Sequence, residues 1–256
     1  MATERATPDD MVGKALHLLT LLGQYSAGRS ISDISRESGF PLSTTHRLLG
    51  SLARHGFVES DSESRRYRVG IKVFELGQRV SHARGFAGTA IPVLQSIVDE
   101  TGEAALLAVR EATEQLYVHS LPSPRPVQIK ADPGSRGPLH ATAMGKVLVA
   151  FSPSPLREEL IETLPLTRLT ANTITDREVF RQRIEQVRAT GYGTAIEENE
   201  EGVNVIGVPL LSPTGDAFAA IAVAAPATRV DAVALEAFLP VLRAAAERLA
   251  VLLPRP

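Results

Sequence analysis

The sequence has no cysteine and no long apolar run, and both absences narrow the classes of protein it can belong to. Without a cysteine among its 256 residues, the chain can form neither disulfides nor thiolate metal sites, which is compatible with a reducing cytoplasm. No apolar stretch approaches the ~18 uncharged residues that a membrane-spanning helix needs. The first ten residues are polar and acidic, so we expect no secretory signal and a cytoplasmic location.

A strong charge of either sign is also lacking, because the formal net charge is only −2. This value averages two unlike parts of the chain. Residues 1–85 hold 12 Lys and Arg against 9 Asp and Glu, whereas residues 86–256 hold 15 against 20. A balance of +3 followed by one of −5 fits a DNA-reading segment joined to an acidic domain that does not touch DNA, although such a split also arises by chance.

Three helices are predicted in the first 55 residues. Apolar residues at helical spacing predict one that begins at a cap, Asp9 or Asp10, and runs to about Tyr25. Ser30–Asp33 has the form of a capping box and opens a second, short helix. After a Gly-Phe-Pro turn, a third helix is expected over residues 42–55. Two short helices joined by such a turn have the spacing of a helix-turn-helix.

A basic hairpin and a further helix follow. Phe57–Glu59 and Tyr67–Val69 have the pattern of strands on either side of a polar turn, which predicts the wing of a winged helix-turn-helix. Helical spacing then returns and predicts a linker helix that ends near Gly85. We therefore expect a winged helix-turn-helix at residues 9–70, a linker helix at 71–85 and a second domain at 86–256.

The second domain mixes strands and helices. We expect helices at 88–101, 142–151, 155–163, 175–190 and from Asp231 to the end, and strands at 104–110, 115–121, 127–131, 192–196, 203–211 and 217–225. A mostly antiparallel sheet with helices on one or both faces makes the whole chain an α+β protein of two domains.

The outer face of the third helix carries side chains suited to the major groove of DNA. An arginine can form a bidentate contact with guanine, and hydroxyl groups can reach bases or phosphates. Arginines of the wing can hold the DNA backbone or the minor groove. The candidate DNA-binding residues are Ser43, Thr44, His46, Arg47, Ser51, Arg65, Arg66 and Arg68. An isolated helix of this kind is more often a solvated basic face, but the order helix, turn, helix and basic hairpin favours DNA binding.

These patterns resemble the IclR-type transcriptional regulators over nearly the whole chain. The first segments with this resemblance are Ile31–Ile34, Gly39–Leu49 and His55–Val58, in the expected DNA-binding domain. Gly137–Lys146 is similar to the central motif of the family, and Gly191–Gly193, Glu197, Glu198, Gly202, Val203, Gly215 and Ala219–Ile221 are similar to its C-terminal signature.

The resemblance implies that residues 86–256 form a GAF-like domain for effector binding and oligomerisation. It further implies a homodimer or a dimer of dimers, and repression or activation of neighbouring metabolic genes. Paired recognition helices would then bind double-stranded DNA at a pseudo-palindromic operator.

The family's effector pocket maps onto seven positions, which are Ile129, Ala143, Met144, Ala195, Val205, Ala222 and Ala224. Members that sense small 2-oxo acids carry Asp, Cys and Ser at several of these places. Alanine and valine side chains offer an anion no hydrogen bonds, and a buried carboxylate without them is costly. We therefore expect an apolar or aromatic effector, with an aromatic acid still open because backbone N–H groups near Thr142 can hold an anionic tail. The same residues could also fill an ordinary core around a vestigial pocket.

No catalytic or metal motif is present in the sequence. Gly145-Lys146 is not a phosphate loop, because His140 and Val147 stand where that loop needs Gly and Ser or Thr. There is no nucleophile elbow of the Gly-x-Ser-x-Gly type, and the six histidines lack zinc-ligand spacing. We predict a regulator without catalysis, cofactor or metal. The alternatives are a DNA-binding oligomer that ignores ligands and an enzyme with a fused DNA-binding module.

Overall fold

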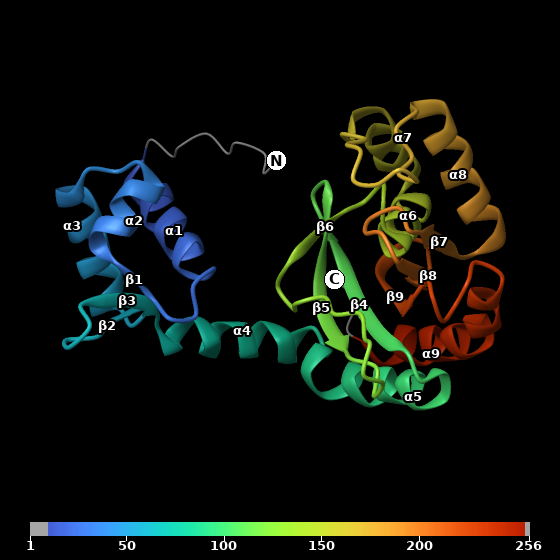
Figure 1. Cartoon of the computed structure of the whole chain (residues 1–256), viewed down its shortest axis with the longest axis horizontal. Helices are drawn as coiled ribbons and strands as arrows, with labels where there is room; N and C mark the ends of the chain where they lie inside the picture. The colour runs from blue at the N-terminus through green and yellow to red at the C-terminus, as the bar shows by residue number, and fades with distance from the viewer. Residues whose placement is uncertain (1–9, 254–256) are drawn as a thin grey trace. The chain divides into compact units, whose positions relative to one another are not determined.

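The computed structural model describes residues 10–253. The chain forms two compact units that divide after Ser81, and each unit is described by itself. Their elements are labelled in Figure 1. None of the helices in the described residues is long and apolar enough to cross a membrane.

The first unit is a bundle of three helices with a small sheet. Its helices are α1 (Met11–Leu22), α2 (Ile31–Ser38) and α3 (Leu42–Arg54), and its strands are β1 (Arg29–Ser30), β2 (Val58–Ser60) and β3 (Arg66–Val69). The sheet is antiparallel in the order β1-β3-β2. Its core gathers one face of each helix, with Leu18, Ile34 and Leu49 fully buried.

Local chemistry explains where these helices begin and end. The Asp10 carboxylate accepts a hydrogen bond from the Gly13 N–H at 2.8 Å, which caps α1, while the alternative cap Asp9 lies outside the described residues. At α2 the Ser30 hydroxyl accepts from the Asp33 N–H, as the capping box predicts. The prediction that the first helix reaches Tyr25 is wrong. Helix α1 ends at Leu22. After Gly23 the backbone N–H groups of Gln24 and Tyr25 bond to the carbonyl three residues earlier, rather than four as in an α-helix.

Helix α4 (Ile71–Ala83) follows the wing, and the division between the two units falls within it. Gly85 then adopts a left-handed conformation with φ of +69°. The second unit continues with a π-helical turn, η1 (Phe86–Ala90), and with α5 (Ile91–Thr101).

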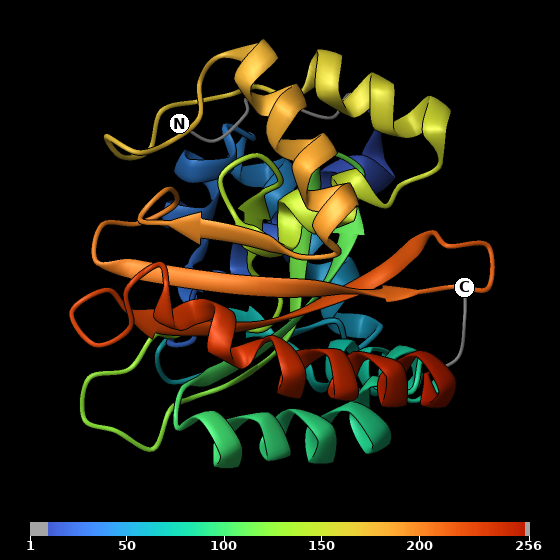
Figure 2. The same cartoon turned by 90° about the vertical axis from the view of Figure 1, so that its right-hand side faces the viewer.

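The second unit is a six-stranded antiparallel sheet between two layers of helices. The strands are β4 (Ala104–Glu111), β5 (Glu114–Leu121), β6 (Arg136–Pro138), β7 (Gly193–Ile196), β8 (Val203–Leu211) and β9 (Ala217–Pro226), in the order β6-β5-β4-β9-β8-β7. The remaining helices are α6 (Ala143–Ala150), α7 (Ser154–Thr163), α8 (Arg177–Thr190), the 3-10 helix η2 (Ala234–Phe238) and α9 (Leu239–Leu252). Figure 2 shows green α5 and red α9 on one side of the sheet, with α7 and orange α8 on the other.

Two apolar cores result from this sandwich. Alternate residues of the central strands point to opposite faces, so Leu107 packs with α5 and α9 while Leu106 packs with α6 and α8. Because both faces are covered, β4 and β9 are nearly continuous apolar runs rather than alternating ones. The expected α+β architecture with two domains is therefore confirmed.

Two predictions in this unit are wrong in detail. The strand expected at 127–131 is absent, and the short strand β6 pairs with β5 instead. Backbone groups of the expected strand bind side chains rather than another strand: the Ala131 N–H donates to Ser120 Oγ, and the Val127 carbonyl accepts from Arg229. The last α-helix begins at Leu239 rather than near Asp231, after the separate helix η2. Pro240 lies in its first turn, a position that tolerates proline.

Candidate DNA-binding surface and effector pocket

Helix α3 presents a polar face to solvent. Ser43, His46 and Arg47 are exposed, and Thr44 and Ser51 are half-buried. The opposite face, with Thr45, Leu48 and Leu49, is buried against the rest of the unit. The guanidinium of Arg47 contacts the sulfur of Met11 at 3.6 Å, and it makes no ion pair within the described residues. All five predicted positions on this helix are therefore accessible to a ligand on one side.

The three wing arginines differ in their freedom. Arg65 lies at the hairpin turn, exposed, with φ of +54°. Arg66 donates to the Gly28 carbonyl at 3.3 Å. Arg68 forms an ion pair with Glu59 at 3.0 Å. Arg65 thus differs from Arg66 and Arg68, whose guanidinium groups are held by partners within the first unit.

A cavity of about 300 Å³ lies between the sheet of the second unit and the start of α6. Ala195, Val205 and Ala224 form one row of cross-strand neighbours along its wall. Ala143 and Met144 enter from α6, and Ile129 comes from the segment between β5 and β6. The structure thus brings together six of the seven positions predicted for the effector.

Ala222 is the exception, since it does not line the cavity. It is fully buried in the core on the same face of the sheet, opposite Gly207 and close to Met144. Helix α6 covers this position, so its methyl group is separated from the open space.

Sequence analysis missed a polar region of the cavity wall on β5. Gln115 is fully buried, and neither its Nε2 nor its Oε1 has a hydrogen-bond partner. Tyr117 lies two residues further along the same strand and also lines the cavity. Burial raises the pKa of the Tyr117 hydroxyl, and the nearby Gln115 amide partly offsets this rise without making a hydrogen bond of normal geometry.

The pairing of β5 with β6 makes room for these two side chains. Gly137 is the partner of Gln115 across the strands. A Cβ atom at position 137 would lie 3.1 Å from Gln115 Nε2 and 3.3 Å from the Tyr117 hydroxyl. Gln115 and Tyr117 alternate with the apolar Leu116 and Val118 on this strand, and this alternation is the signal that could have revealed this part of the site.

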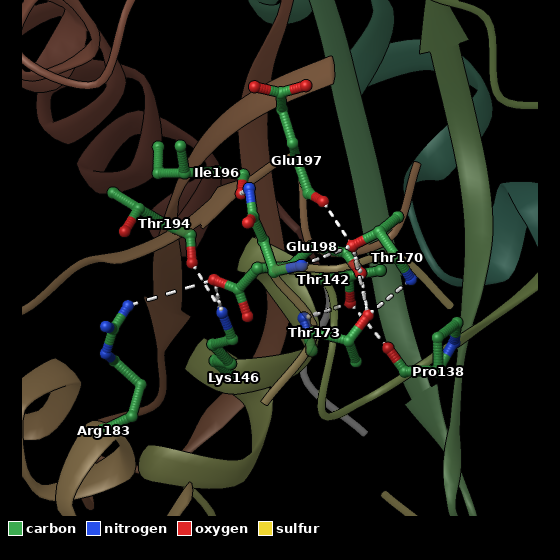
Figure 3. Close-up of polar contacts among 12 residues, drawn as sticks. Pro138, Thr142, Lys146, Thr170, Thr173, Arg183, Thr194, Ile196, Glu197 and Glu198 are labelled. Atoms are coloured by element: carbon green, nitrogen blue, oxygen red, sulfur yellow. Dashed lines mark hydrogen bonds and ion pairs between the residues drawn. The ribbon is translucent and has the colours of Figure 1, made fainter. Parts of the chain in front are cut away.

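A buried ion pair lies close to the wall of the cavity, and Figure 3 shows its two partners, Lys146 and Glu198. Lys146 of α6 is fully buried; its ammonium donates to the Thr194 carbonyl at 2.8 Å and pairs with Glu198. Burial lowers the pKa of Lys146 to about 8, and the negative charge of Glu198 limits the fall. The pair fixes the loop after β7, and Asn199 and Glu200 of this loop line the cavity.

The segment before α8 is tied to the same loop. The hydroxyl of Thr170 donates to the Glu197 carbonyl at 2.6 Å, and that of Thr173 donates to the Glu198 carbonyl at 2.7 Å. His140 is also bound here, with its Nε2 at 3.0 Å from the Thr167 carbonyl. Burial lowers the pKa of His140, so the neutral ring is favoured and its role is that of a packed donor.

The start of α6 is closely packed as well. Thr142 caps the helix by accepting from the Gly145 N–H at 3.1 Å and donates to the Pro138 carbonyl at 2.7 Å. A Cβ atom at position 145 would lie only 2.5 Å from the backbone of Leu139. The N–H groups of Ala143 and Met144 belong to the first turn and have no acceptor within the helix. Both residues line the cavity, so the first turn of α6 forms part of its wall.

Across residues 10–253, no three His, Asp or Glu side chains are grouped so that they could hold a metal ion.

Two family models together cover most of the chain. The IclR helix-turn-helix domain matches residues 11–62. The model described as the bacterial transcriptional regulator IclR C-terminal matches residues 78–251. A DNA-reading unit followed by a larger unit with a cavity defines a transcriptional regulator with a sensing domain.

Curated relatives and solved structures agree with these matches. The probable transcriptional regulator SauR of Cupriavidus necator is 33% identical over 92% of this chain and 94% of its own length. The transcriptional repressor AllR of Klebsiella pneumoniae is 31% identical over 85% of this chain and 80% of its own. An IclR homolog of Microbacterium hydrocarbonoxydans, crystallised with 4-hydroxybenzoate, is 27% identical and superimposes with a TM-score of 0.84 over 95% of this chain and 98% of its own. The chain belongs to the IclR family of DNA-binding transcriptional regulators.

Proposed function

We propose that helix α3 reads a pseudo-palindromic operator through Ser43, Thr44, His46, Arg47 and Ser51, with the wing arginines Arg65, Arg66 and Arg68 on the DNA backbone. The exposed polar face of α3 supports this assignment, and Arg47 has free donors for a guanine. The parts that carry the function are the winged helix-turn-helix at 9–70, the linker helix at 71–85 and the effector and oligomerisation domain at 86–256.

The cavity of the second unit is proposed to bind a small apolar or aromatic effector that changes the affinity for DNA. The observation that carries this proposal is the row of Ala195, Val205 and Ala224 on one wall of a cavity of about 300 Å³, a volume at the lower end for small-molecule sites. The relative crystallised with 4-hydroxybenzoate supports a small aromatic acid. Its carboxylate would lie at the free N–H groups that begin α6.

A homodimer, or a dimer of dimers, is proposed for DNA binding. Large apolar side chains are exposed on α1 and on α4, including Val12 (69%), Ile71 (63%) and Phe74 (60%). Such surfaces are typical of interfaces between protein chains. A dimer would give two α3 helices, which matches the two half-sites of a palindromic operator.

We further propose that the protein acts in the cytoplasm, and that it binds its effector without turning it over. Its curated relatives are regulators of transcription. Thr142 of the cavity wall and the adjacent His140 are hydrogen-bonded within the fold, and Gln115 is neutral. Turnover of a bound compound by the purified protein would contradict this proposal.

The decisive experiment is binding of the purified protein to DNA from its own upstream intergenic region. It would be titrated across salt concentrations, with and without a panel of aromatic and small aliphatic acids. We expect selective binding that weakens by orders of magnitude as salt rises and that shifts with aromatic compounds only. Selective binding that no compound changes would favour a vestigial pocket, and no selective binding would refute the DNA assignment.

A further inference from the structure

The side chain of Met11 lies beside the arginine that is proposed to read DNA bases. Met11 is the first residue of α1 and stands 36 positions before Arg47 in the sequence. Its sulfur is 3.6 Å from Nη2 of Arg47, and within residues 10–253 this is the one hydrogen-bonding contact of the Arg47 side chain. A chemical change at this sulfur therefore acts directly on the guanidinium that α3 presents to DNA.

Met11 is also a place where the chain exposes sulfur to solvent. The sequence has no cysteine and three methionines, Met1, Met11 and Met144. Met144 is 2% exposed and packed in a core of the second unit, whereas Met11 is 44% exposed. An oxidant in water reaches an exposed thioether before a buried one. Of the two methionines in the described part of the chain, Met11 is therefore the one that is oxidised first.

Oxidation changes what this sulfur offers to Arg47. A thioether sulfur is a weak hydrogen-bond acceptor, so the contact at 3.6 Å leaves the guanidinium free for DNA. Hydrogen peroxide converts the thioether to a sulfoxide. The sulfur lone pair forms a bond to one peroxide oxygen, the O–O bond breaks, and the other oxygen leaves as water after taking the proton of the first. The sulfur is oxidised by two electrons, and its new oxygen is a stronger acceptor within reach of Nη2.

We infer that Met11 is an oxidation-sensitive modification site that controls how freely Arg47 can bind DNA. The inference rests on the proposed function, because it takes the role of Arg47 in reading the operator as given. In the reduced protein the guanidinium binds DNA. In the sulfoxide form it donates to the new oxygen, and this hydrogen bond competes with the contact to DNA. Methionine sulfoxide reductases reverse the modification, so the change is a switch rather than damage.

The first test compares operator binding before and after oxidation. Wild-type protein and Met11→Leu would be treated with hydrogen peroxide, and mass spectrometry would show which methionines gain oxygen. Fluorescence anisotropy with DNA from the upstream intergenic region should give an affinity about fivefold lower for the oxidised wild-type protein, the size of one net hydrogen bond. Methionine sulfoxide reductases should restore it. Met11→Leu is the matched control, because it retains Met1 and Met144, and its affinity should not change.

Three results of this test would overturn the role of Met11. They are equal losses of affinity in the two proteins, no loss in the oxidised wild-type protein, and a Met11 that peroxide leaves unoxidised while the protein stays folded. If the untreated protein does not bind this DNA selectively, the proposed reading of DNA by α3 is itself rejected, and the inference falls with it.

The second test asks whether the effect passes through Arg47. Met11→Gln places an amide oxygen near the position of the sulfoxide oxygen, so it should lower operator affinity without any oxidant, whereas Met11→Leu should not. In Arg47→Ala, which lacks the guanidinium, oxidation of Met11 should leave the remaining affinity unchanged. A Met11→Gln variant that binds as Met11→Leu does, or an Arg47→Ala variant that loses as much affinity on oxidation as the wild-type protein, overturns the inference.

Discussion

The two candidate sites of this protein are built in opposite ways. The DNA-binding face draws its residues from one helix and one hairpin, between Ser43 and Arg68, and most of their side chains are exposed. The candidate effector cavity draws its walls from segments far apart in the sequence, between Leu106 and Ala224, and it combines buried residues such as Met144 with exposed ones at its mouth. A surface site is defined by the atoms it offers, whereas an enclosed site depends equally on the packing that keeps space open.

The largest effect should come from the ion pair that supports the cavity. Lys146→Met leaves Glu198 buried without its main partner, and breaking a buried pair in this way costs about 3–5 kcal/mol. The double variant Lys146→Met/Glu198→Met should recover most of this loss. Denaturant unfolding monitored by circular dichroism would measure both, and a loss below about 1 kcal/mol in the single variant would show that the cavity wall does not depend on the pair.

A truncation on the DNA-binding face should leave stability intact and affect recognition. Arg47→Ala is expected to weaken binding to the operator by about 1–3 kcal/mol and to relax base preference. Fluorescence anisotropy with the operator and a scrambled duplex would separate the two effects. If both duplexes lose the same affinity, Arg47 contacts phosphate and the reading of bases falls to other residues of α3.

A larger side chain in the cavity should weaken effector binding and leave the affinity for DNA unchanged. Ala195→Leu adds bulk at a position that lines the cavity and is 2% exposed, so effector affinity should fall tenfold or more. Affinity for the operator without effector should match that of the wild-type protein. Titration calorimetry and anisotropy give the two values, and an unchanged effector affinity would place the ligand elsewhere.

The smallest effects are expected for substitutions of the wing arginines. Here the comparison is between Arg65, which has no ion pair within the described residues, and Arg68, which is paired with Glu59. Arg65→Ala should weaken binding equally on any sequence and reduce the salt slope by about 1. Arg68→Ala should have a smaller effect on DNA binding, because Arg68 is already paired with Glu59. The loss of that exposed ion pair should cost at most ~1 kcal/mol of stability. DNA affinity of the two variants would be measured across salt concentrations. A larger loss for Arg68→Ala than for Arg65→Ala would contradict this order and show that the ion pair with Glu59 opens when DNA binds.

The contrast between the sites also decides what could be predicted from sequence. Helical periodicity places Ser43 and Arg47 on the face opposite Leu48, so a single helix suffices to assign the surface. The cavity needed a family resemblance to bring Ile129, Met144 and Ala224 together, because they are distant in sequence. The resemblance did not reveal that Ala222 is covered by the core or that Gln115 is left unpaired. Both depend on how strands pair and how α6 packs, which no local pattern encodes.

The same limit applies to the elements that are wrong in detail. The apolar alternation of Val127, Ile129 and Ala131 resembles a strand, yet Ile129 and Ala131 turn their side chains to the cavity instead. A pattern of period two requires only that alternate residues meet an apolar surface. Whether a neighbouring strand is present to pair with the backbone depends on the rest of the fold.

The tight packing at Gly145 has a consequence for altering the specificity of this sensor. No side chain fits at that position without displacing the backbone of Leu139, so the turn that starts α6 is a fixed part of any descendant or engineered variant. The alanines at 195 and 224, by contrast, face open space. New ligand preferences are therefore most accessible through substitutions on the strands, with the helix start as a constant frame that any library should leave untouched.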